Sequence, residues 1–513
     1  MNEYKSSVGK NLIEILMFSM YPDAKIIYRE YIQNACDAIK EAVNKGVLSR
    51  YRDGHITVNI DDNTNRIQIS DNGIGISFDD VEPILLNIAD SRKDGRNMAG
   101  QYGIGRLVGA GYCKTLSFKT SYKGETKASE IIFDVVKARE ILDNADDHRS
   151  ASEVIDAITI KKEYEADSDD HYFIATLNDV RQEYPELLDE EIITNYLKEV
   201  APIDYGLPFK NNLIHNSIPE EYRQLQNDIC NFQISINEES DIRKRYGMRI
   251  EGTGDDIHTL EYFKLEDDKY GLLAWGWYAV TAFSKAIPVA DSNRGIRLRK
   301  HNILIGNPDV LNQYFKEPRG NNYFYGEIHA INSKLKPESS RSGLAPTPEA
   351  ICFQARLRDY FNSLVQLYHL ANDTKNAVKE MSIVSTQIDD GQFLTDVPEV
   401  KDKWDAAKKK IESIERGKNA QSDVAKKVID IIKRNIDVTP DNIDFTEKHS
   451  KQGVGRIEKS EAIDILDPLK SKYSEDKITL IRRIFSALTD NCPSKDKRLI
   501  EELKKKVVKD LDI

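Results

Sequence analysis

The chain has 513 residues, which is too long for one hydrophobic core and predicts about three domains. Hydrophobic residues make up 40% and charged residues 31%, a balance typical of packed domains with a charged surface. The net charge of −12 argues against a nucleic-acid-binding surface over the whole molecule, although it leaves a local one open.

The cysteines and the apolar stretches exclude further classes. The five cysteines are scattered without CxxC spacing, which indicates neither a zinc site nor a disulfide framework. The amino-terminal segment lacks the long apolar run of a signal peptide, and the most apolar stretch, 270–283, is too short to span a bilayer. We therefore expect a cytoplasmic protein with no membrane partner.

The first informative element is an amphipathic helix predicted around residues 28–39. At about 100° per residue, Glu30, Asn34 and Asp37 fall within roughly 60° of one another, and the opposite face is apolar. A carboxylate can orient and deprotonate water, and an amide oxygen is a hard ligand that suits Mg²⁺. Taken alone, the pattern also fits a solvated polar stripe.

A predicted β-hairpin follows, and it ends in a second polar segment. Apolar residues alternate over 56–60 and 67–69 around a polar turn, and Asp71 comes directly after them. A carboxylate at the end of a strand can accept a hydrogen bond from an exocyclic amine such as that of adenine. Gly73 and Gly75 let the backbone approach a flat ring. By itself, an ordinary turn explains this segment equally well.

The third segment is a glycine-rich loop, 100–105, that runs into the apolar stretch 107–116. Glycines let consecutive backbone N–H groups point at phosphate oxygens, and a helix amino terminus adds partial positive charge. The spacing of Gly103, Gly105 and Gly109 does not fit a dinucleotide fingerprint. The chain also contains no GxxxxGK[ST] motif, so a P-loop site is not expected.

Together and in this order, the three segments resemble the N-box, the DxGxG box and the second glycine box of the GHKL ATPases. This superfamily includes gyrase, heat-shock chaperone, histidine-kinase and mismatch-repair types. The likeness is closest to the ninety-kilodalton heat-shock chaperones and extends through 11–16 and 20–25 and through 109–112. It implies that Glu30 is the general base, that Asn34 binds Mg²⁺ and that Asp71 binds adenine.

The resemblance also implies an ATP lid that begins near 88–93. The implied cofactors are ATP and Mg²⁺, with Asn34 as the metal ligand. The implied nucleotide-binding residues are Asn34, Asp71, Gly73, Gly75, Asn87, Lys93, Gly100, Gly103, Ile104 and Gly105. The chain departs from the pattern at Arg106, where the chaperones usually carry an aromatic residue. The threonine that often accompanies the adenine-binding aspartate is unassigned, because Thr176 has the wrong register.

A second stretch resembles the middle domain of the same chaperones. Residues 294–305 resemble a strand of that domain, and 326–331 and 335–341 resemble the strand and loop that carry its catalytic arginine. By this match Arg341 would reach the γ-phosphate, where a planar, permanently charged guanidinium can neutralise charge on a transferring phosphoryl group. A surface arginine in a Pro/Ser/Gly loop is the alternative. The charged residues Arg297, Arg299 and Lys300 fit the exposed face of an edge strand.

The fold expected from these patterns is α+β. A Bergerat-type α/β sandwich ATPase domain would occupy 1–212, an α/β middle domain 213–348, and a mainly helical region 349–513. Strands are expected at 270–283, 296–305 and 323–331, with a weak candidate at 232–236. Long helices are expected at 355–381 and 404–434, a linker at 438–455, and further helices at 459–466, 478–488 and 497–508.

These observations predict an enzyme, a Mg²⁺-dependent ATPase that uses the nucleotide to switch conformation as a homodimer. Three uses of that switch remain open. The first is remodelling of protein clients in the manner of the chaperones. The second is an ATP-gated dimeric clamp or bacterial defence component that controls a partner effector or nucleic acid. Phosphotransfer of the histidine-kinase type ranks last, because the Arg341 match is unexpected for it and no dimerisation-histidine helix precedes the ATP site.

Overall fold

In the computed structural model of the chain, residues 8–19, 23–87, 105–237, 241–338, 341–389 and 397–434 are described. They divide into two compact units. The first contains residues up to 373 together with 415–431, and it holds two β-sheets. The second contains residues 374–414 and those after 431. The predicted α+β class is confirmed.

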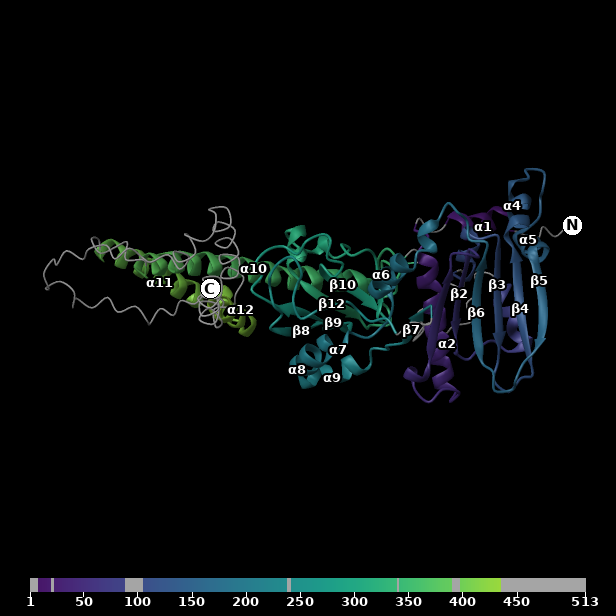
Figure 1. The fold of residues 1–513 in the computed structure, drawn as a ribbon, viewed down its shortest axis with the longest axis horizontal. Coiled ribbons are helices and arrows are strands. Elements are labelled where there is room, and N and C mark those ends of the chain that lie inside the picture. Colours follow the sequence, from purple (N-terminus) through teal and green to yellow (C-terminus); the bar gives the residue numbers. More distant parts are fainter. Residues whose placement is uncertain are drawn as a thin grey trace, which may run out of the picture. The chain divides into compact units, whose positions relative to one another are not determined.

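The first sheet has seven strands in the order β5-β4-β3-β6-β2-β1-β7 (Figure 1). All neighbours are antiparallel except β1 and β7, which are parallel. The strands are β1 His55–Asp61, β2 Arg66–Asp71, β3 Thr115–Ser121, β4 Lys127–Asp134, β5 Thr159–Glu165, β6 Tyr172–Asn178 and β7 Gln233–Ile236. Strand β7 comes from the stretch assigned above to the middle domain.

The predicted hairpin is the β1–β2 pair. Its turn is closed by Asp61, whose side chain accepts hydrogen bonds from the backbone of Asn63 and Thr64, and by Asn65, which adopts a left-handed conformation at φ 50°. Ile67 and Ile69 are buried, and Asp71 follows them on the same face of β2. Because α2 (Ile26–Asn44) packs against β2, Asp71 faces the helical layer.

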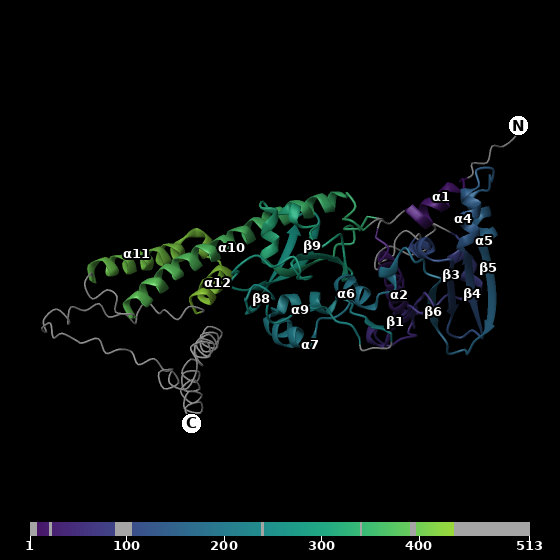
Figure 2. The ribbon, with the colours of Figure 1, turned by 45° about the horizontal axis from the view of Figure 1, so that its top comes forward.

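The remaining helices of the first sheet are short. These helices are α1 Asn11–Glu14, α3 Val81–Leu85, α4 Val135–Asp143, α5 Ala151–Ile158 and α6 Glu190–Val200. A π-helix spans Ile15–Ser19, and 3-10 helices span Tyr51–Asp53, Phe78–Asp80, Gly105–Tyr112 and Pro185–Leu187. Figure 2 shows α1 with α4 and α5 at the β3–β5 side of the sheet. Helices α4, α5 and α6 begin at side-chain caps: Asp134, Ser150 and Asp189 accept from the backbone N–H three residues on.

The second sheet has five strands in the order β11-β10-β12-β9-β8, with β10 and β12 parallel. Its strands are β8 Thr259–Asp267, β9 Gly271–Val280, β10 Gly295–Lys300, β11 Ile303–Leu304 and β12 Tyr325–Ala330. The helices of this region are α7 Leu207–Phe209, α8 His215–Ser217 and α9 Glu220–Asn227. A π-helix spans Lys210–Ile214, and 3-10 helices span Asn312–Tyr314 and Pro318–Tyr323. The strands expected at 270–283 and 323–331 are confirmed as β9 and β12, and the weak candidate at 232–236 is confirmed as β7.

Two predictions for the second sheet are wrong. The single strand at 296–305 is a hairpin, because His301 and Asn302 adopt left-handed φ values of 53° and 63° and turn the chain. The charged residues of β10 are not exposed: Arg297, Arg299 and Lys300 are 3%, 2% and 5% exposed. They are buried because β10 lies between β11 and β12. Glu327 accepts a hydrogen bond from Arg299, and the backbone oxygen of Asn332 accepts one from Lys300.

The helical part contains α10 Pro348–Asp389, α11 Val397–Arg416 and α12 Asp423–Arg434, with a 3-10 helix at Lys418–Ala420. The helix predicted at 355–381 is confirmed within α10. The one predicted at 404–434 is wrong as a single helix, because it ends before Gly417 and restarts as α12. In the second unit, an ion pair of 2.8 Å between Lys410 and Glu380 joins α11 to α10. The linker and helices expected after residue 434 lie outside the described residues.

Candidate active site

Helix α2 brings three predicted polar residues to one site. Glu30 and Asp37 are buried, with 7% and 1% exposure, and Asn34 between them is half-buried. The opposite side of α2 packs into the core of the first sheet through residues such as Ile32 and Ile39. The helix therefore forms as predicted, but its polar face is enclosed and is not a solvated stripe.

Tyr31, which the sequence analysis did not single out, ties the residues that follow the glycine box to α2. Its hydroxyl donates to the backbone oxygen of Arg106 at 2.9 Å and accepts from the backbone N–H of Gly109 at 3.1 Å. Gly105 therefore approaches the general-base candidate. A Cβ added to Gly105 would lie 2.7 Å from Oε2 of Glu30, so this position has no room for a side chain unless Glu30 moves.

Arg341 reaches the same carboxylate. Its Nε donates to Oε1 of Glu30 at 3.0 Å, and both side chains are less than 10% exposed. Nε of Arg29 lies 3.8 Å from the same oxygen, so two guanidinium groups flank Glu30. Arg341 has a left-handed φ of 56°, and its backbone is held by hydrogen bonds to Glu338 and Gly306. The alternative of a surface arginine does not fit this burial.

The other end of the site is built around Asp71. This carboxylate is 6% exposed, and its Oδ1 accepts from the backbone N–H of Gly73 at 2.8 Å. The next residue, Ile74, donates its N–H to the backbone of Ala38, so the loop is tied to α2. Gly75 has a φ of 70°, and its close approach to the carbonyl oxygen of Ser121 leaves no space for a Cβ.

Two residues that the sequence analysis missed brace this loop, one from β3 and one directly before β6. The Nδ1 atom of His171 lies 2.9 Å from the backbone oxygen of Gly73, and the hydroxyl of Thr120 accepts from the N–H of Ile76. Thr176 faces Gln68 across the sheet, while Asp71 faces Phe173. The register argument against Thr176 therefore holds, and no pattern in the sequence alone could have identified His171 or Thr120.

The remaining predicted residues divide into two groups. Asn87 is exposed, and its backbone oxygen accepts from Arg106 at 3.0 Å. Lys93, Gly100, Gly103 and Ile104 lie outside the described residues. Within the described part of the chain, no group of three or more His, Cys, Asp or Glu residues is arranged to hold a metal ion, and no helix is long and apolar enough to cross a membrane.

A helix that presents a carboxylate and an amide, a strand-end aspartate and Gly105 lie together on a sheet covered by helices. Comparison with protein families agrees with this description. Residues 25–163 match the family described as histidine kinase-, DNA gyrase B-, and HSP90-like ATPase. The chain therefore carries a GHKL-type ATPase domain.

Among curated proteins, the chain is similar to several that are named chaperone protein HtpG. The segment similar to chaperone protein HtpG of Clostridium acetobutylicum is 25% identical over 209 residues, 38% of this chain and 30% of that protein. The HtpG of Alcanivorax borkumensis is 29% identical over 131 residues, 22% of this chain and 21% of that protein. The HtpG of Idiomarina loihiensis is 32% identical over 114 residues, 19% and 18% of the two chains. The chain thus spans less than a third of the length of these relatives.

Proposed function

We propose that this chain hydrolyses Mg²⁺-ATP with Glu30 as the general base and Arg341 as the residue that neutralises charge on the transferring phosphoryl group. The observation that carries the proposal is their contact. The two residues are 311 positions apart in the sequence, yet their side chains pair at 3.0 Å in a buried place beside Gly105. An incidental surface arginine has no reason to be buried against a carboxylate of a nucleotide-site helix.

The residues present fit the nucleotide and its metal. Asp71 is buried beside a loop that closely approaches α2, where a Cβ on Gly73 would lie 2.6 Å from Ala38, and its carboxylate can accept from the exocyclic amine of a purine. Asn34 offers an amide oxygen one helical turn from Glu30. Asn34 would hold Mg²⁺, which neutralises phosphate charge when it is bound.

The chemistry then follows from the chain's own groups. Arg341 is paired with Glu30, so the two side chains share their charges. The γ-phosphate of bound ATP competes for that guanidinium, because a phosphate accepts bidentate hydrogen bonds from arginine. When Arg341 moves to the phosphate, Glu30 is left to accept a proton from the attacking water.

Substitution of Glu30 by glutamine tests this assignment. Glu30→Gln keeps the size of the side chain and removes the base, so hydrolysis should fall about 10²- to 10⁴-fold while ATP binding stays within a few-fold of wild type. The control is Glu41→Gln on the same helix, which pairs with Lys45 away from the site and should leave both unchanged. Hydrolysis at the wild-type rate by Glu30→Gln would refute the assignment.

We further propose that the ATP cycle drives the remodelling of protein clients and that the chain acts as a homodimer. The support is that the relatives found are named as chaperones. ATP-dependent suppression of the aggregation of a heat-denatured protein, absent with Glu30→Gln, is the expected result, with a dimer in sedimentation. Salt-dependent nucleic-acid binding without suppression would instead favour the clamp.

A further inference from the structure

The two sheets of the first unit are joined by three chain crossings. Helix α6, which packs on α2, leads through 201–205 into the core of the second sheet. The chain returns through 228–232 to β7, which pairs with β1 in the first sheet. The chain crosses a third time after β7: residues 241–245 lead to Tyr246, which packs against Trp277 of the second sheet.

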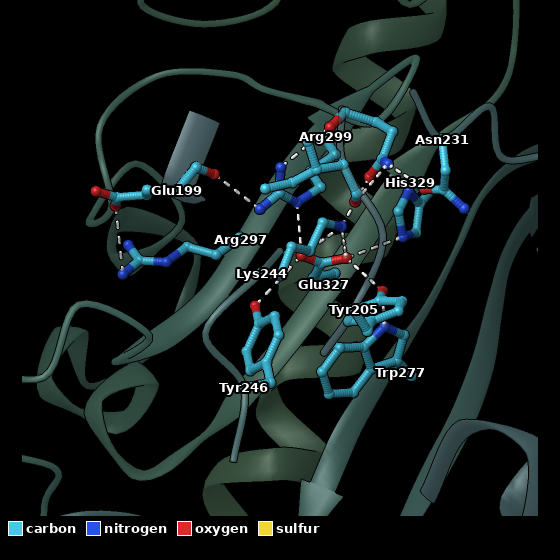
Figure 3. Close-up of polar contacts among 12 residues, drawn as sticks. Glu199, Tyr205, Asn231, Lys244, Tyr246, Trp277, Arg297, Arg299, Glu327 and His329 are labelled. Atoms are coloured by element: carbon cyan, nitrogen blue, oxygen red, sulfur yellow. Dashed lines mark hydrogen bonds and ion pairs between the residues drawn. The ribbon is translucent and has the colours of Figure 1, made fainter. Parts of the chain in front are cut away.

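All three crossings are held by one buried polar cluster, which we call the Glu327 cluster (Figure 3). Its centre is the fully buried carboxylate of Glu327 on β12. This carboxylate accepts hydrogen bonds from Lys244 at 2.8 and 3.0 Å, from Arg299 at 2.6 Å and from Tyr205 at 2.6 Å. The remaining members are Glu199, Asn231, Tyr246, Trp277, Arg297, Asn302 and His329.

Each crossing contributes a different partner. From the first, Tyr205 binds Glu327, and the backbone oxygen of Glu199 accepts from Arg299 at 2.9 Å. From the second, Asn231 accepts from Asn302 at 2.9 Å. From the third, Lys244 binds both Glu327 and Asn302. The cluster therefore ties each of the three crossings to β10, to β12 or to the turn that follows β10.

The composition of the cluster argues for a role beyond stability. Lys244, Arg299 and Glu327 are 3%, 2% and 0% exposed, so two cations share one carboxylate out of contact with water. Desolvation of such groups offsets much of their attraction, and apolar side chains of similar volume often give equal or greater stability. What apolar side chains cannot supply is a fixed geometry, since charged hydrogen bonds specify direction.

The strands that carry the cluster also carry the Arg341 loop. Lys300, next to Arg299, donates to the backbone oxygen of Asn332 at 2.7 Å at the start of that loop. Beyond β11, Gly306 donates to the backbone oxygen of Arg341 at 2.8 Å. The path from the crossings to Arg341 is therefore a short series of strands and hydrogen bonds within one sheet.

We propose that the Glu327 cluster is a positioning unit for Arg341: it anchors the three crossings to β10, β12 and the turn after β10, so that the arginine meets Glu30 in one orientation. This inference rests on the proposed function of Arg341, and it adds residues that do not touch the nucleotide. Misplacement of a charge-neutralising group by about 1 Å can reduce a rate about 10²-fold.

The test uses the full-length chain and a variant designed to fold. Lys244→Met, Arg299→Met and Glu327→Leu together replace the three charges by apolar groups. Glu327→Gln is the milder second variant. The matched control is Asp255→Asn, which neutralises another buried carboxylate of the second sheet region; this one bonds Thr281 and Ser284 and contacts no crossing.

Two measurements are made on each protein. We expect both cluster variants to keep the wild-type Kd for ATP while kcat falls by tenfold or more, and Asp255→Asn to keep both. In hydrogen exchange without nucleotide, segments 199–205 and 241–246 should exchange faster in the cluster variants, with β8 and β9 unchanged. Wild-type kcat in the folded triple variant, or faster exchange spread evenly over the second sheet, would overturn the proposal. If the wild-type chain does not hydrolyse ATP, the proposed function fails, and the exchange data still decide whether the cluster anchors the crossings.

Discussion

Gly75 offers a quantitative test of the loop that follows Asp71. Its φ of 70° lies in the left-handed region, and an added Cβ would lie 1.9 Å from the carbonyl oxygen of Ser121. Gly75→Ala therefore has two costs. The left-handed conformation costs about 1–2 kcal/mol for an alanine. The overlap requires β3 or the loop to shift, which typically costs about 1–3 kcal/mol.

Gly124 separates the two costs. It has a φ of 93°, and a Cβ there would meet nothing within 4 Å, so Gly124→Ala has the conformational cost alone. We expect the free energy of unfolding to fall by about 1–2 kcal/mol for Gly124→Ala and by about 2–5 kcal/mol for Gly75→Ala. At roughly 2–4 °C of Tm per kcal/mol for a domain of this size, the two Tm values should differ by several degrees.

The assays are urea denaturation and ATP titration of the same two proteins. Gly75→Ala should also weaken ATP binding more than tenfold, because the shifted loop holds the Asp71 carboxylate through Gly73, while Gly124→Ala should bind normally. If the two variants are equally stable and bind ATP equally well, then the close packing of this loop does not hold the Asp71 carboxylate, and the reasoning about the purine end of the site is refuted.

Two further predictions concern single side chains. Asp71→Asn should raise the Kd for ATP by about tenfold or more, since a lost charged hydrogen bond costs roughly 1.5–3 kcal/mol. Calorimetry measures this Kd, and a wild-type value would mean that Asp71 only stabilises the turn. Burial and the neighbouring Arg299 lower the pKa of Lys244 to about 7, although the attraction of Glu327 opposes them. The unfolded lysine, with a pKa near 10.4, binds more protons between about pH 7 and 10, so stability should rise with pH across this window. Denaturation of wild type at pH 7 and 9 should show that rise and Lys244→Met should lack it, whereas equal slopes would place the titration elsewhere.

The nucleotide-binding part of the fold was largely predictable, because its signals are local. The alternation around Asp71 specifies a hairpin, and the spacing of Glu30 and Asn34 specifies one helix face. What the sequence could not provide was the long-range environment. The bracing of the Asp71 loop by His171 depends on how β6 meets β2, and no local pattern encodes that pairing.

The wrong prediction for β10 has a physical cause, which is that its charged residues were assumed to be exposed. Arg299 was assigned to a solvent-facing edge because isolated charges are rarely buried. Its partner Glu327 lies 28 residues away, on a parallel strand, and the match becomes visible only when the sheet is assembled. The break at Gly417 was missed because the charge pattern of a long helix continues on both sides of it.

The central claim is that a residue of the second sheet region completes the ATPase site of the first. It is tested most directly by hydrolysis and ATP binding of Arg341→Ala, with Arg319→Ala as the control, since Arg319 is an exposed arginine of the same region. We predict that Arg341→Ala binds ATP within a few-fold of wild type and hydrolyses it at least about 10²-fold more slowly, while Arg319→Ala matches wild type in both. Hydrolysis by Arg341→Ala at the wild-type rate would contradict the account and leave the ion pair with Glu30 as a structural contact only.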